Sequence, residues 1–137
     1  MDGPSCVHNT EKVVKAIGFW PGFHDAEVIS VSASRNGVGY AASSSARLCV
    51  NVRLHKEIGQ GTADYAVVCF RSLLIELLFY DLHAFSVEDF NHQNVIDSIE
   101  FSRKAEELIE VNVSSIFGFG GVIGCARVEV GDVTILM

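Results

Sequence analysis

The chain is 137 residues long, a length typical of one domain with one continuous core, and we expect residues 1–137 to form a single domain. Hydrophobic residues make up 49% of it, which excludes an intrinsically disordered chain. The net charge of −7 is uneven: residues 1–60 carry six Lys or Arg and five Asp or Glu, whereas residues 61–137 carry four and twelve. The acidic second half lacks the basic surface that nucleic-acid binding requires, so we expect no nucleic-acid partner.

Apolar residues are distributed in short runs. None reaches the roughly 18–20 residues that a membrane-spanning helix needs, and the closest candidate, residues 73–80, contains Glu76. The N-terminal sequence MDGPSCVHNTEK lacks the basic start and apolar segment of a secretory signal. We therefore expect a cytoplasmic protein that does not contact a membrane.

The four cysteines lie far apart and include no Cys-x-x-Cys pair: Cys6, Cys49, Cys69 and Cys125. In a cytosolic chain such cysteines are typically reduced rather than joined in disulfides or bound to zinc. We expect no metal and no other cofactor.

The first predicted element is a short helix over residues 9–18. Asn9 or Thr10 can cap its start, and Gly18 is suited to its C-terminal stop. A turn-rich connection follows. The alternation in residues 27–35 then predicts a strand with Ile29 facing the core, and Asn36-Gly37 predicts a turn.

The second half of the chain reads as further strands. Residues 47–57 alternate strictly, which predicts that Leu48, Val50, Val52 and Leu54 face inward. Residues 58–64 form a loop, and residues 65–81 form one long bent strand or two short ones. Residues 87–95 are polar and predict a turn or one helical turn. Strands are expected over 96–102, 107–115 and 123–130, then a turn at Gly131-Asp132 and a final short strand over 133–137.

These elements predict an α+β fold, in which one N-terminal helix packs on a sheet of six or seven strands. The connections between strands are too short to contain helical crossovers. We therefore expect a mostly antiparallel sheet, with one face on the core and the other polar.

Two clusters are candidate sites, and the first combines His24, Asp25 and Glu27. Their types suit metal binding or acid–base chemistry, but a strand would direct Asp25 and Glu27 to one face and His24 to the other. A structural interpretation has Asp25 capping backbone N–H groups of the turn while His24 bonds to a backbone carbonyl. This interpretation is favoured, with partner contact and metal binding as alternatives.

The second cluster spans residues 79–97, where carboxylates and histidines alternate with aromatic residues. Aromatic side chains supply desolvated contacts at protein interfaces, and carboxylates pair there with Arg or Lys. A metal site through His83, Asp89 and His92, and a purely structural role, are the alternatives. The predicted partner-binding residues are Asp81, His83, Glu88, Asp89, Asn91, His92 and Asp97.

The run Gly118-x-Gly120-Gly121 precedes a predicted strand rather than a helix, so it indicates a bent hairpin and not a phosphate loop. No Ser, Cys or Thr has the context of a nucleophile elbow, and we expect no enzymatic activity.

Three stretches together resemble the immunity protein 50 family of bacterial polymorphic toxin systems: FWPGFHDAEVISV, VEDFNHQNVID and SSIFGFGG followed by CARVEV. Their order is that of the family, and the resemblance covers roughly residues 12 to 131. The loops at 36–46 and 57–64 depart from the family pattern. The matching positions are Trp20, Phe23, His24, Asp25, Ala26, Glu27, Asp89, Phe90, Asn91, Gln93 and Asn94.

The resemblance implies a small cytosolic protein that binds and neutralises a cognate toxin domain, with most matching residues serving the fold. Many toxin domains are nucleases with basic clefts, so the acidic second half could act as a phosphate mimic. Two alternatives stay open: a metal-binding protein or hydrolase that uses His24, Asp25 and Glu27, and an oligomerising module that pairs through exposed edge strands. Both monomer and homodimer are compatible with the sequence.

Overall fold

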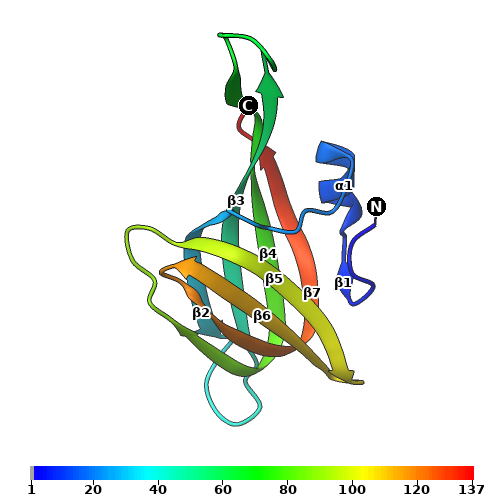
Figure 1. Ribbon diagram of the computed structural model, residues 1–137. Coiled ribbons are helices and arrows are strands. Elements are labelled where there is room, and N and C mark those ends of the chain that lie inside the picture. Colours follow the sequence, from blue (N-terminus) through cyan, green and yellow to red (C-terminus); the bar gives the residue numbers. More distant parts are fainter. Residues whose placement is uncertain (1) are drawn as a thin grey trace.

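The computed structural model describes residues 2–137 and is built mostly of sheet, as predicted (Figure 1). It contains seven strands and one short helix. In chain order the elements are β1 (Val7–His8), α1 (Glu11–Ile17), β2 (Glu27–Arg35), β3 (Ser44–Ile58), β4 (Ala66–Glu88), β5 (Val95–Ala105), β6 (Leu108–Phe117) and β7 (Gly120–Ile135).

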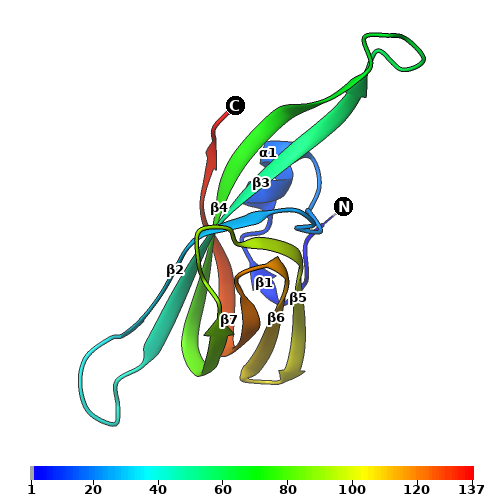
Figure 2. The same cartoon turned by 60° about the vertical axis from the view of Figure 1, so that its left-hand side comes forward.

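The sheet closes on itself. Its strand order is β1-β7-β4-β3-β2-β5-β6, and β6 also pairs with β7. Six strands therefore form a ring, in which β5 and β6 cross in front of β2, β3, β4 and β7 (Figures 1 and 2). The ring is antiparallel throughout, as expected, and the two-residue β1 adds one parallel pair outside it.

The core fills the inside of this ring. The predicted inward face of β3 is confirmed, because Leu48 and Val50 are fully buried. On β4, Leu77 and Phe79 are equally buried, and they continue the same alternation on the neighbouring strand. Burial of each such side chain contributes about 1.5–3 kcal/mol, so the ring is stabilised mainly by its interior.

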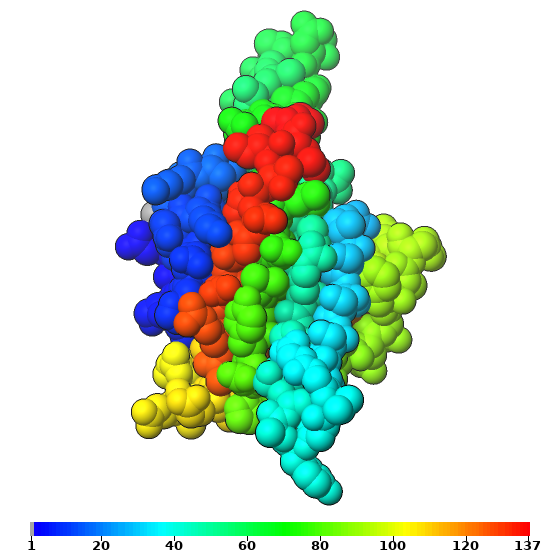
Figure 3. All heavy atoms as spheres, turned by 180° about the vertical axis from the view of Figure 1, so that it is seen from behind, coloured from blue at the N-terminus to red at the C-terminus, as the bar shows by residue number. Residues whose placement is uncertain are grey.

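The helix α1 lies within the predicted range and packs against β7, as the adjoining blue and red surfaces of Figure 3 show. Gly18 ends it in the left-handed conformation, with φ of 90° and its N–H donating to Val14 O, as expected. The predicted side-chain cap is wrong: the capping position is Thr10, but its side chain makes no capping hydrogen bond. Fully buried Val13 anchors the helix instead.

The strand predicted over residues 27–35 is confirmed as β2. The inward orientation of Ile29 and the turn at Gly131-Asp132 are wrong, and bulges explain both. An irregularity between Val28 and Ser30 leaves Ile29 47% exposed rather than in the core. The chain does not turn at Gly131-Asp132, because β7 continues to Ile135 past an irregularity opposite β4. Val130 pairs with Leu77 and Val133 pairs with Ile75, so Gly131 and Asp132 together stand opposite the single residue Glu76 and form a bulge.

Both hairpins at the ends of β3 extend beyond the ring (Figure 2). The predicted long strand over 65–81 is one strand, which starts at Ala66 and continues to Glu88. Its first residues pair with the end of β3 to form a twisted two-stranded arm. At the opposite end, the loop over 36–43 connects β2 to β3. Among the described residues, no helix is long and apolar enough to cross a membrane.

Candidate partner-binding surface

The Trp-Pro-Gly-Phe stretch forms the turn that leads into β2. Phe23 is 2% exposed, and Trp20 packs edge-on against it and against Phe101 of β5, with ring centroids 5.6 and 6.1 Å apart. Phe23 and Asp25 both have positive φ, at 65° and 64°. The aromatic contacts hold this irregular backbone in place, since such conformations are unfavourable for residues other than glycine.

This turn also completes the ring. Asp25 N donates to Ile96 O at 3.0 Å, and Ile96 N donates to Ala26 O at 2.9 Å. Val28 N then donates to Asn94 O at 2.9 Å. These backbone bonds join β2 to β5, where the ladder itself has a single registered pair, so the motif fastens the two ends of the sheet together.

His24 lies between two carboxylates on the outer side of this junction. Its Nδ1 is 2.9 Å from Asp97 Oδ1, and its Nε2 is 3.5 Å from Asp25 Oδ2. The hydrogen bond to Asp97, reinforced by the charge of Asp25, raises the pKa of His24 above its ordinary value. The predicted bond from His24 to a backbone carbonyl is wrong, and so is the expected separation onto opposite strand faces. Residues 23–26 form a turn, and β2 begins at half-buried Glu27.

The Asn-rich loop between β4 and β5 is held by amide side chains. Asn94 is 3% exposed: its Oδ1 accepts from Asn91 N at 2.8 Å and from Phe119 N at 3.2 Å, and its Nδ2 donates to Asn91 O. The Asn91 side chain donates to Asp89 O and accepts from Gln93 N. The side chain of Asn91, predicted to contact a partner, is therefore occupied within the loop.

The same loop is packed against the β6–β7 turn. Gly118 has φ of 75°, and a Cβ there would lie 2.7 Å from Asn94 Oδ1. Phe90 packs edge-on against buried Phe119, with centroids 6.2 Å apart, yet stays 47% exposed. Phe117, opposite Val95 in the ladder, is 57% exposed. Two aromatic side chains thus face solvent where loop and turn meet.

We define the seam surface as the exposed residues around this junction: His24, Asp25, Glu88, Asp89, Phe90, His92, Asp97 and Phe117. The segments that build it, residues 16–34, 72–102 and 105–126, contain no Lys or Arg. Its charged groups are therefore carboxylates and histidines. Contacts between β2, β5 and the loop bring these residues together, although they are up to 93 positions apart in the sequence.

Two of the predicted partner-binding residues lie elsewhere. Asp81 and His83 precede Glu88 on β4 by seven and five positions, which separates Asp81 from the seam surface by roughly 20 Å of extended strand. Asp81 lines a shallow pocket with Tyr80 and Arg127. The seven predicted residues therefore do not form one patch.

A polar network on the outer face of β3, β4 and β7 was not predicted from the sequence. Glu76 accepts from Arg47 and, through Oε1, from Asp132 N at 3.1 Å. Burial is the largest single influence on the pKa of Glu76 and would raise it. The hydrogen bonds from Arg47 and Asp132 N, together with the charges of Arg47 and Lys12, outweigh burial, and the pKa of Glu76 is lowered. Glu76 stands opposite Cys49, which is two residues from Arg47 on β3. The pairing of β3 with β4 therefore brings the charges of Arg47 and Glu76 within reach of each other.

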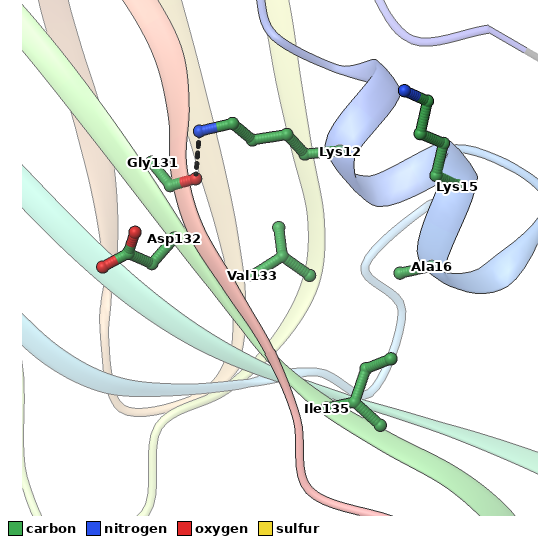
Figure 4. A pocket seen from close by; sticks show the side chains of 7 residues that line it. All are labelled: Lys12, Lys15, Ala16, Gly131, Asp132, Val133 and Ile135. Carbon is green, nitrogen blue, oxygen red and sulfur yellow. Dashed lines mark hydrogen bonds between the residues drawn. The ribbon is translucent and has the colours of Figure 1, made fainter.

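The same network extends to the helix. Lys12 Nζ donates to Gly131 O at 3.1 Å across an open groove of about 440 Å³ between α1 and β7 (Figure 4). Lys15 and Asp132 also line it. Neither histidine nor cysteine lines this groove. Of its charged residues, Lys12 contacts β7 through Gly131 O, and Asp132 lies at the bulge of β7.

Within residues 2–137, no group of three or more His, Cys, Asp and Glu side chains could hold a metal ion. His24 has two carboxylate neighbours, but Glu27 does not join them. The four cysteines are all free.

Comparisons with known proteins identify the family. The model of a family described as immunity protein 50 matches residues 9–136, nearly the whole chain. No curated protein and no solved structure gave a match. The matched region includes the Trp-Pro-Gly-Phe turn, the Asn-rich loop and every strand of the closed sheet. The chain therefore belongs to the immunity protein 50 family.

Proposed function

We propose that this protein is a non-catalytic immunity protein, which binds and neutralises a cognate bacterial toxin domain in the cytoplasm. The family match over residues 9–136 carries this proposal. Residues 1–137 then act as a single immunity-protein domain, with no cofactor.

The seam surface is our candidate for the toxin contact. Phe90 and Phe117 present two exposed aromatic rings, the residue type that provides desolvated anchors at interfaces. Carboxylates surround them without a compensating Lys or Arg, so the local field favours a basic partner. A nuclease toxin with a basic cleft has the matching charge, and the carboxylates would then take the place of nucleic-acid phosphates.

Most of the family-motif residues have structural roles in this proposal. Trp20, Phe23 and Asn94 contact other parts of the chain and complete the ring. His24, Glu27 and Gln93 lie beside these contacts. Partner recognition falls to exposed neighbours such as Asp89, His92 and Asp97, whereas Asp81 and His83 form a separate candidate area on β4.

A growth-rescue experiment tests the role itself. The toxin domain encoded beside this gene is expressed with and without the protein, and surviving cells are counted. Rescue together with a stoichiometric complex is expected. If two folded proteins give neither rescue nor complex, the proposal is wrong.

The surface assignment needs a second measurement. Neutralising Glu88→Gln, Asp89→Asn and Asp97→Asn together should slow association by about tenfold or more and reduce its salt dependence, because steering depends on local charge. The matched control removes three exposed carboxylates elsewhere, through Asp64→Asn, Glu106→Gln and Glu107→Gln. Equal association rates for the two triple variants, measured by stopped flow, would show that net charge and not the seam surface steers the toxin.

A further inference from the structure

β3 and β4 continue beyond the ring as an arm, which we define as residues 52–71 (Figures 1 and 2). β2 pairs with β3 only as far as Asn51, and β7 pairs with β4 only as far as Leu73. Beyond β7, Leu136 and Met137 bond to Ser72. Within residues 2–137, β3 is thus the one strand paired with residues 66–71. In such a ribbon, alternate residues direct backbone N–H and C=O groups away from the partner strand, so both edges are open.

The two open edges of the arm differ in composition. The β3 edge carries Arg53, His55, Lys56 and Glu57, and charged side chains of this kind protect an edge against pairing. The β4 edge, residues 66–70, has the sequence AVVCF, with β-branched and aromatic residues and no charge. The β4 edge is uncharged and has high β propensity, so it can pair with another strand more readily than the charged β3 edge.

This β4 edge is exposed and held in an extended conformation. Val67 is 57% exposed and Phe70 is 46% exposed. The arm is braced by Tyr65, whose hydroxyl donates to Glu57 Oε1 at 3.1 Å, and by Lys56, whose Nζ lies 5.5 Å from the centroid of the Phe70 ring. A strand that is already ordered loses little conformational entropy when it pairs with another.

Charge distribution decides which partner suits this edge. Three cations and two carboxylates give the arm a net charge of +1: Arg53, Lys56, Arg71, Glu57 and Asp64. The rest of the chain therefore has a net charge of −8, and the whole chain has −7. Two copies repel each other mainly through their acidic ring portions, whereas two arms of charge +1 each repel only weakly. A basic toxin, in contrast, is attracted to the acidic seam surface and not to the arm.

We propose that a second copy of this chain pairs along the β4 edge at Ala66–Phe70, giving a homodimer joined through the two arms. A twofold axis aligns the two segments antiparallel, so each apolar segment faces its own copy, and no like charges stand opposite each other. The ladders of both arms then form a continuous four-stranded sheet. Pairing at this edge leaves the seam surfaces of both copies free.

The test measures the mass of the protein alone by light scattering and sedimentation over a range of concentrations. We expect the mass to rise from 14.9 kDa toward twice that value. Val67→Lys places a charge on the edge opposite Glu57 of the same arm, so the monomer should stay folded. This variant should weaken dimerisation by at least about tenfold. The control, Ile29→Lys on β2, changes a similarly exposed residue and should dimerise as the wild type does.

Amide hydrogen exchange of the unmodified chain gives a second readout that needs no variant. The amides of residues 66–70 should exchange more slowly at concentrations where the dimer forms, while those of residues 89–93 stay unchanged. A mass of 14.9 kDa at every concentration up to the millimolar range would overturn the proposal. A dimer that withstands Val67→Lys would equally overturn it. Because no toxin is present, failure here leaves the proposed immunity function untouched.

Discussion

Asn94 is the residue whose replacement best tests how the ring is closed. Its buried side chain makes three hydrogen bonds, to Asn91 N, Asn91 O and Phe119 N. Asn94→Ala removes all of them and leaves the fully buried Phe119 N–H without this acceptor. At about 1 kcal/mol for each bond, the free energy of unfolding should fall by about 3 kcal/mol. For a chain of this size that corresponds to a decrease in Tm of roughly 10 °C.

Urea denaturation followed by circular dichroism measures this loss. The control is Asn112→Ala on β6, which removes one side-chain hydrogen bond, to Glu110, from a half-buried residue and should cost about 1 kcal/mol or less. An unfolding free energy for Asn94→Ala within about 1 kcal/mol of the wild type would refute the reasoning. The loop would then keep its shape through backbone bonds and aromatic packing alone.

Three other substitutions test separate parts of the structure. Gly118→Ala should lower the unfolding free energy by about 2 kcal/mol or more, because φ is 75° and the new Cβ meets Asn94; an unchanged urea midpoint would contradict the packing of loop on turn. Leu77→Ala, at a fully buried position, should cost about 2–5 kcal/mol by calorimetry, and a smaller loss would mean that the ring interior relaxes around the cavity. The pKa of His24 is raised in the folded state by Asp97, so its stabilising effect is fully present below the ordinary pKa of about 6.5 and is lost as pH rises through the folded value. His24→Gln should therefore reduce the decrease in stability between pH 6 and 8, and an identical pH profile would show that this contact contributes nothing.

The candidate site was only partly predictable from its residues. The acidic and aromatic character of residues 79–97 is visible in the sequence, and so is the resemblance of the Trp-Pro-Gly-Phe turn to the family. The contact between His24 and Asp97 joins positions 73 apart, and no local pattern indicates it. Assigning His24, Asp25 and Glu27 to strand faces by alternation failed, because positive φ at Phe23 and Asp25 keeps residues 23–26 in the predicted turn, outside β2.

The mostly-sheet architecture, the inward face of β3 and the helix stop at Gly18 were predictable from the amino-acid sequence alone. Each of these depends on neighbours within a few residues: side-chain alternation for strands, and tolerance of positive φ for the glycine. Only the tertiary structure decided that β6 returns to β7, that Ile29 and Gly131 lie at bulges, and that Asp81 is remote from Asp97. Strand pairing and register depend on backbone hydrogen bonds between distant segments, and such bonds leave no periodic signature in either segment alone.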